Sequence, residues 1–365
     1  MKKSLLISLL LFSLLISFSG CGRHSAPSST ATSKVPVIGM VLDKGGLGDE
    51  SFNDSAYRGL KKAEKKFGNK MGVKLLESHS SADYYPNLQA LAQSGCSIIF
   101  AVGYLMTDAV KQVAPQFPNT KFAIIDGVIP NLPNVASLTF KEQESSFLAG
   151  FLAGSMTRTK TVGFIGGEKS WLIKKFEAGY KAGVETANPK VRILVGFTGS
   201  FSNPSIGEEM ALAQFSEGAD IIYHAAGACG IGVIAAAKKK GNGYFAIGVD
   251  EDQDGLAPGR VLTSAEKHVN VAVYDTIQSF MKGKFTPGIH KYGLKNGGVG
   301  LSPMEYTKKD IPPKVLKLLA VYTKAISAGK IVVPETLSEL KKFHPERLSL
   351  EKLTKEKSNS KKAKS

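Results

Sequence analysis

The sequence predicts an α/β protein made of two similar units in tandem. Short apolar segments that suit buried strands alternate with segments whose apolar residues recur at helical spacing, which is typical of a parallel sheet covered by helices on both faces. This alternation restarts near Thr161, and 365 residues are enough for two domains. Hydrophobic residues make up 43% of the chain, so it can bury a core, and disorder over most of its length is excluded.

The first unit is predicted to begin with the continuous apolar run at 37–42, which ends at Asp43 and a glycine-rich loop. Helical spacing of apolar residues follows from about 52 to 67, and strand and helix patterns then alternate. Strands are expected at 37–42, 73–77, 97–101, 121–126 and 134–140, and helices at 52–67, 84–94, 106–113 and 142–156. In the second unit, strands are expected at 162–166, 191–197, 220–223, 244–250 and 260–266, and helices at 171–187, 208–216, 231–239 and 269–281.

Residues 1–20 have the composition of a secretory signal: a basic start, an apolar stretch at 5–18 that is too short for a comfortable membrane span, and small residues. Cys21 follows directly and resembles the cysteine of a bacterial lipobox, which is acylated and becomes the mature N-terminus. The alternative is an ordinary cleaved signal with an incidental cysteine. Residues 21–35 are rich in Ser, Thr, Ala and Pro, which predicts a flexible tether.

Polar and aromatic residues gather where the predicted strands end. Ligand sites in open α/β sheets lie beyond the carboxyl ends of the strands, so these residues are the first candidates for a binding site. Carboxylates and a lysine offer hydrogen bonds and charge, and rings can lie on the flat face of a ligand. The open alternatives are helix-capping aspartates, a solvated lysine, and a core phenylalanine behind a capping serine. The candidates are Asp43, Ser51, Phe52, Asp126, Tyr223, Gly227, Asp250 and Lys267.

No motif supports catalysis, a cofactor or a metal. The sequence contains neither G-x-S-x-G nor H-E-x-x-H, and its six histidines show no ligand spacing. Residues 163–170 resemble a phosphate-binding loop, but Glu168 replaces its second glycine. Residues 250–255 match the first half of an EF-hand loop, but Val261 stands where the bidentate glutamate is needed, so only a weak calcium site remains as an alternative. We therefore expect a binding protein and not an enzyme.

Several of these segments resemble, in order and spacing, the basic membrane protein family of lipid-anchored substrate-binding proteins of ABC importers. They are Asp43 with 51–53, and 122–126, 163–167, 176–180, 248–253 and 262–267. The resemblance covers about residues 36–335 and implies the type I periplasmic-binding-protein fold, in which two Rossmann-like lobes are joined by three crossing strands. It implies an N-terminal lobe of 36–140 plus 265–285, a C-terminal lobe of 141–264 plus 286–335, and a basic tail at 336–365 whose composition is that of a disordered segment.

The family includes a purine nucleoside receptor in which two aromatic side chains enclose the base. The resemblance implies that Phe52 and Tyr223 take these positions and that Asp126 reads the edge of the base. Stacking together with one carboxylate suits a purine, which has two flat faces and an edge of donors and acceptors. The positions that match groups around the base and the ribose hydroxyls are Asp43, Gly227, Asp250 and Lys267.

The implied function is capture of purine nucleosides by a monomeric protein and their delivery to the permease and ATPase subunits of an ABC importer. The implied location is the extracytoplasmic side of the cell membrane, with a palmitate-type lipid anchor at Cys21, and no nucleic acid partner is implied. The alternative is a surface adhesin or signalling receptor with a different or vestigial ligand site. The net charge of +16 supports that alternative, because basic surfaces attract polyanions and anionic membranes.

Overall fold

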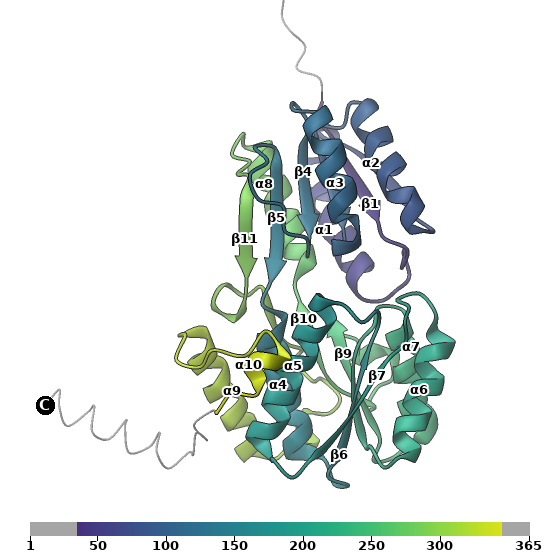
Figure 1. Ribbon diagram of the computed structural model, residues 1–365, viewed down its shortest axis with the longest axis vertical. Coiled ribbons are helices and arrows are strands. Elements are labelled where there is room, and N and C mark those ends of the chain that lie inside the picture. The colour runs from purple at the N-terminus through teal and green to yellow at the C-terminus, as the bar shows by residue number, and fades with distance from the viewer. Residues whose placement is uncertain (1–34, 345–365) are drawn as a thin grey trace, which may run out of the picture. The chain divides into compact units, whose positions relative to one another are not determined.

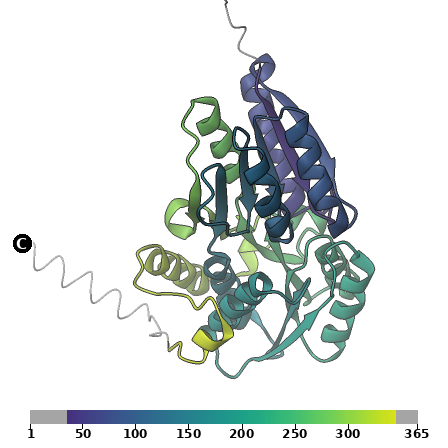
Figure 2. The same ribbon diagram turned by 45° about the horizontal axis from the view of Figure 1, so that its top comes forward.

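The computed structural model describes residues 35–344, which form two α/β lobes, each built around a six-stranded sheet (Figures 1 and 2). The predicted signal at 1–20, Cys21 and the tether up to residue 34 lie outside the described residues, as do residues 345–365 of the predicted tail. Within the described range, no helix is both long and apolar enough to span a bilayer.

The first sheet contains strands β1 (Val37–Leu42), β2 (Gly72–Glu77), β3 (Ile98–Val102), β4 (Lys121–Ile125), β5 (Val135–Phe140) and β11 (Gly288–Tyr292). The helices of this lobe are α1 (Phe52–Phe67), α2 (Tyr84–Gln93), α3 (Thr107–Val113) and α8 (Val269–Met281). All pairings are parallel, in the order β11-β5-β4-β3-β1-β2. Helices α1 and α8 pack together on one face, and α2 and α3 cover the other (Figure 1). The central strands are buried on both faces, which explains their continuous apolar runs.

The second sheet contains β6 (Thr161–Gly166), β7 (Arg192–Phe197), β8 (Ile221–Ala225), β9 (Phe245–Asp250), β10 (Val261–Lys267) and β12 (Val299–Leu301). Its helices are α4 (Glu142–Met156), α5 (Trp171–Ala187), α6 (Pro204–Ser216), α7 (Cys229–Lys240), α9 (Pro313–Ser327) and α10 (Leu337–Leu340). The order is β12-β10-β9-β8-β6-β7, and only β12 is antiparallel to its neighbour. Apart from the outer strands β11 and β12, the two sheets therefore have the same topology.

The chain passes between the lobes three times, after β5, after β10 and after β11. Two of these crossings are bonded to each other, because the amide of Lys141 donates to the carbonyl of Tyr292 at 2.7 Å. Two six-stranded sheets that are parallel except for β12, with three crossings between them, are the predicted type I periplasmic-binding-protein architecture, which is thereby confirmed.

Three segments depart from the predicted lobe boundaries. Residues 265–267 were assigned to the first lobe, but they belong to β10 of the second sheet. β11 pairs with β5 of the first sheet, although residues 286–335 were assigned to the second lobe. As an edge strand, β11 is only half-buried, so it lacks the apolar run that would have revealed it. The predicted tail also begins too early, because α10 is ordered and Phe343 packs edge-on against Phe147 of the second core.

Helices α4 and α5 approach each other closely through glycines, and this contact sets the position of α5 relative to the second sheet. A Cβ atom at Gly150 would lie 2.0 Å from the carbonyl oxygen of Tyr180, and one at Gly183 would lie 2.0 Å from that of Phe147. Only glycine permits such a backbone approach. The N-terminal turns of α5 are thereby held at the end of the second sheet.

Candidate functional site

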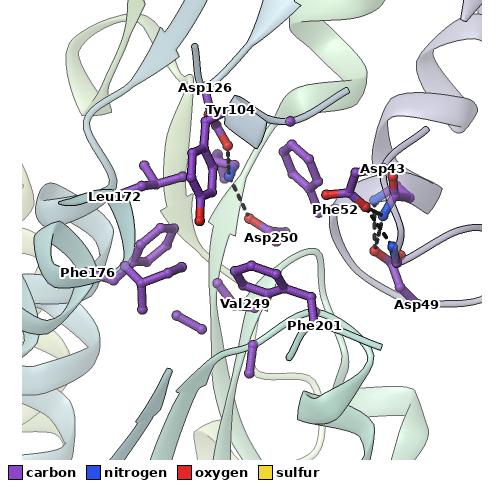
Figure 3. A pocket seen from close by; sticks show the side chains of 18 residues that line it. Asp43, Asp49, Phe52, Tyr104, Asp126, Leu172, Phe176, Phe201, Val249 and Asp250 are labelled. Atoms are coloured by element: carbon purple, nitrogen blue, oxygen red, sulfur yellow. Dashed lines mark hydrogen bonds and ion pairs between the residues drawn. The ribbon is translucent and has the colours of Figure 1, made fainter. Parts of the chain in front are cut away.

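A pocket lies where the carboxyl ends of the two sheets meet, which is the position expected for a ligand site in α/β folds (Figure 3). The space inside it, including the part open to solvent, is about 540 Å³. Both lobes line it. The first lobe supplies Asp43, Gly45, Asp49, Phe52, Asn53, Gly103, Tyr104 and Asp126, and the second supplies Leu172, Ile173, Phe176, Phe201, Ala225, Ala226, Gly227, Val249, Asp250 and Lys267.

The centre of the pocket holds a lysine between two aspartates. Lys267, at the end of β10, lies 2.8 Å from Asp126 Oδ2 and 3.2 Å from Asp250 Oδ1 (Figure 3). Asp126 follows β4 and Asp250 ends β9, two strands that occupy the same place in their sheets. Both aspartates adopt left-handed backbone, with φ of 64° and 65°. Aspartate tolerates this conformation better than most residues, so the two ends can turn toward one lysine.

The protonation of this cluster reflects its burial. Burial raises the pKa of Asp126 to about 7, although the charge of Lys267 opposes the rise. Burial acts to lower the pKa of Lys267, but the carboxylates of Asp126, Asp250 and Glu142 outweigh it and raise that pKa. Glu142 is itself paired with Lys175 at 2.8 Å. Asp126 Oδ1 receives no hydrogen bond from any described residue, so it is available to a ligand donor.

A second polar cluster surrounds Asn53 in the first lobe. Its amide Nδ2 donates to Asp43 Oδ1 at 2.9 Å and to Asp49 Oδ2 at 3.1 Å. Because both partners are carboxylates, the amide orientation is fixed and Asn53 Oδ1 is left as a buried acceptor without a donor among residues 35–344. Burial raises the pKa of Asp43, and it raises that of Asp49 to about 6. This side of the pocket therefore calls for hydrogen-bond donors on the ligand.

Aromatic rings supply the apolar surface. Phe52, the first residue of α1, is half-buried and has Lys267 Nζ 4.5 Å from its ring centroid. Phe176 on α5 and Phe201 between β7 and α6 line the pocket from the second lobe (Figure 3). Both were missed as site residues, although Phe176 belongs to a segment that carried the family resemblance. Phe201 lies in a loop at a strand end, which is the signal that could have identified it.

Tyr223 does not line the pocket, which corrects its predicted role as the second stacking ring. It is fully buried, its hydroxyl lies 3.1 Å from Ser146 Oγ, and its ring lies 5.2 Å from that of Tyr180. Side chains alternate between the two faces of a strand, and Tyr223 faces the core beneath α4 and α5. The pocket is reached only where β8 ends, at Ala225.

Ser51 and Gly227 have different relations to the pocket. Ser51 is fully buried and does not line the pocket, but its hydroxyl donates to Asp250 Oδ2 at 2.9 Å and so joins the lobes behind the site. Gly227 does line it, with a φ of 55° that favours glycine. The structure thus brings seven of the eight predicted ligand residues to the pocket or directly behind it.

Besides the pair of Lys267 with Asp126, two partly exposed ion pairs join the lobes. Lys44 pairs with Glu168, and Arg58 pairs with Glu251, each linking a loop or helix of the first lobe to the second. All four side chains remain partly exposed, so each pair contributes little stability on its own. Together with Ser51, they show that the lobes are in contact around the pocket.

Two α/β lobes, three crossings and a polar and aromatic pocket between the sheets define a two-lobed solute-binding protein. Residues 37–335 match the family described as ABC transporter substrate-binding protein PnrA-like, and the chain belongs to this family. It is therefore a substrate-binding protein of an ABC transporter and not an enzyme.

Named relatives match over most of their length. The chain is 36% identical to basic membrane protein A1 of Borrelia garinii subsp. bavariensis, over 93% of this chain and 98% of the relative. It is 34% identical to the ABC transporter nucleoside-binding protein BmpA of Lactococcus lactis subsp. cremoris, over 91% and 99%. It is 39% identical to the CD4+ T-cell-stimulating antigen of Listeria monocytogenes, over 83% and 89%.

Solved structures agree on the fold. An ABC transporter solute-binding protein from Aeropyrum pernix matches with a TM-score of 0.77 and 29% identity, over 84% of this chain and 96% of that one. The Lac repressor bound to ONPG matches with a TM-score of 0.57 and 16% identity, over 77% of this chain and 86% of that one, which shows the shared fold alone.

Proposed function

We propose that this protein captures purine nucleosides and delivers them to the permease and ATPase subunits of an ABC importer. The observation that carries the proposal is the pairing of aromatic surface with buried, unpaired acceptors: Phe52 and Phe201 line the same pocket as Asp126 Oδ1 and Asn53 Oδ1. A purine has two flat faces for the rings and N–H groups for the acceptors. The name of the Lactococcus lactis relative supports a nucleoside as ligand.

The remaining charged groups suit the sugar. Ribose hydroxyls both donate and accept hydrogen bonds, so Asp250 and Lys267 can each serve one of them. Four aspartates and one lysine line the pocket. This excess of carboxylate disfavours a phosphate, so we expect nucleosides to bind in preference to nucleotides.

The test is isothermal titration calorimetry of the purified protein with purine and pyrimidine nucleosides, free bases, nucleotides, sugars and amino acids. Purine nucleosides should bind most tightly, and Phe52→Ala should weaken them at least about tenfold through lost stacking and buried area. Addition of EDTA should change nothing. A sugar or amino acid that binds more tightly than every nucleoside would contradict the proposal.

We also propose that a lipid on Cys21 anchors the protein to the extracytoplasmic face of the cell membrane, and that the chain acts as a monomer. Cys21 follows an apolar segment and small residues, which is the setting of a lipobox cysteine. Cys21→Ala should move the protein from the membrane fraction to the soluble fraction. Continued membrane association of that variant would contradict the anchor.

A further inference from the structure

Tyr104 brings a hydroxyl into the pocket from the first lobe. It begins the 3₁₀ turn Tyr104–Met106 that follows β3, and its ring packs edge-on against Trp171 of α5, with centroids 6.1 Å apart. Figure 3 shows the ring among Asp126, Leu172 and Phe176, with its hydroxyl directed toward the middle of the lining side chains. The tyrosine therefore contacts the opposite lobe and faces the ligand space.

The hydroxyl is fully buried and makes no hydrogen bond with any described residue. Burial raises the pKa of Tyr104, and Ser170, as a hydrogen-bond donor to the ionised form, partly offsets this rise, so the group stays protonated and its own proton remains available to a ligand. A buried polar group without a partner is costly, and native structures rarely keep one without a reason. The pocket offers that reason, because a bound ligand can supply the missing partner.

The other side-chain donors of the pocket already have at least one partner within the protein. Among the lining residues, N–H or O–H donors are carried by the side chains of Asn53, Tyr104 and Lys267. Asn53 Nδ2 donates to two carboxylates, and Lys267 Nζ lies between Asp126 and Asp250. Tyr104 is thus the lining side chain whose donor makes no hydrogen bond in the described part of the chain.

We propose that the Tyr104 hydroxyl donates a hydrogen bond to an acceptor atom of the bound nucleoside and thereby helps to determine specificity. The inference rests on the proposed nucleoside function and adds a requirement to it. Asn53 Oδ1 and Asp126 Oδ1 require donors on the ligand, whereas Tyr104 requires an acceptor such as a ring nitrogen, a carbonyl oxygen or a hydroxyl oxygen. Ligands that lack that one acceptor are selected against, because the hydroxyl then stays unpaired.

The experiment compares unaltered protein with Tyr104→Phe by calorimetry on a set of purine nucleosides that each lack one acceptor. The set contains 1-deaza, 3-deaza and 7-deaza analogues and 2′-, 3′- and 5′-deoxy analogues of the tightest-binding nucleoside. Tyr104→Phe should weaken the parent nucleoside about threefold to tenfold. One analogue should bind unaltered protein as weakly as the parent nucleoside binds Tyr104→Phe, and Tyr104→Phe should bind that analogue no more weakly still. The atom missing from that analogue is the acceptor.

The matched control is Tyr180→Phe, which removes another buried hydroxyl without a partner among the described residues but lies outside the pocket. It should leave every affinity unchanged. Trp171 is the single tryptophan of the chain, so a change in its fluorescence emission can show that Tyr104→Phe still binds the ligand. Equal affinities of Tyr104→Phe and unaltered protein for the whole set overturn the role of Tyr104 alone. Failure of unaltered protein to bind any nucleoside overturns this inference together with the proposed function.

Discussion

The two lobes share one topology, yet they form different walls of the pocket. After β1, the first lobe places Asp43, Asp49 and Asn53 on the pocket, whereas after β6 the second lobe places Leu172 and Phe176 there. The first wall is rich in acceptors, and the second is largely apolar. A repeated fold therefore fixes where a ligand lies, while the loops of each lobe decide which part of the ligand that lobe contacts.

The exception to this asymmetry lies at the centre. Asp126 and Asp250 end equivalent strands, have nearly the same φ, and share Lys267. The lysine belongs to the second lobe and one of its partners to the first, so this ion-paired cluster also joins the walls. Removing one partner of this buried cluster should destabilise the protein more than removing one partner of the partly exposed pairs Lys44–Glu168 or Arg58–Glu251, because it leaves a buried charge unpaired.

The largest expected effect comes from removing the acceptor of the polar wall. Asp126→Asn keeps the shape of the side chain and tolerates the left-handed backbone. It removes the negative charge that pairs with Lys267 and that can accept a hydrogen bond from the ligand. Hydrogen bonds to charged groups contribute about 1.5–3 kcal/mol, so nucleoside affinity should fall by tenfold to about a hundredfold in calorimetry. Asp108→Asn, on an 85% exposed side chain of the same lobe, is the control. Unchanged affinity in a folded Asp126→Asn protein would show that the carboxylate of Asp126 does not contribute to ligand binding.

The apolar wall depends on packing behind it, and the next prediction removes part of that packing. Phe343 contacts Phe147 of α4, and Leu340 packs against the same core. A chain that ends at residue 335 should lose about 1.5–3 kcal/mol of unfolding free energy relative to one that ends at residue 344, because two partly buried apolar side chains, Leu340 and Phe343, are lost. Denaturant unfolding of the two truncated chains measures the difference. Equal stability would mean that residues 336–344 are dispensable, as the predicted tail implied.

A direct test of the apolar wall is Phe201→Ala. If Phe201 stacks on the base, the variant should bind purine nucleosides about tenfold more weakly, from lost stacking and buried area. Phe285→Ala, which alters a partly buried ring of the first lobe away from the pocket, should bind normally in the same titration. If both variants bind like unaltered protein, the second wall encloses the ligand without stacking on it.

A smaller, pH-dependent effect follows from the raised pKa of Asp126. Its folded-state value is about 7 against an ordinary 3.8, so the folded protein holds this proton more tightly than the unfolded chain. The resulting stability is fully present below about pH 4 and is lost as the pH rises through 7. Between pH 5 and 8, the melting temperature of ligand-free protein should therefore fall relative to that of Asp126→Asn. Parallel curves for the two proteins would show that the carboxyl is ionised throughout.

The sequence predicted the fold well because buried strands and amphipathic helices leave strong periodic patterns, and helices α1, α4, α5 and α8 begin and end at the predicted residues. It also predicted that Phe52, Asp126 and Asp250 lie close together, because strand ends in this topology meet at one place. The error at Tyr223 has a physical reason. In a strand that is buried on both faces, apolar residues do not alternate with polar ones, so the pattern cannot tell which face a ring lies on. The half-buried β11 leaves an equally weak signal.

The smallest expected effect distinguishes Tyr223, whose ring lies in the second core, from Phe201, whose ring lines the pocket. Tyr223→Phe removes only the hydroxyl that lies 3.1 Å from Ser146 Oγ, beneath α4. One buried neutral hydrogen bond contributes about 0.5–1.5 kcal/mol, so the unfolding free energy should drop by that amount. Nucleoside affinity should not change, because Tyr223 lies in the second core and does not line the pocket. Calorimetry and denaturant unfolding should therefore give opposite results for the two variants. Tyr223→Phe should lose stability and keep its nucleoside affinity, whereas Phe201→Ala should mainly lose nucleoside affinity. A loss of affinity in Tyr223→Phe would show that the second wall is held in place by the polar contacts of its core as well as by its apolar packing.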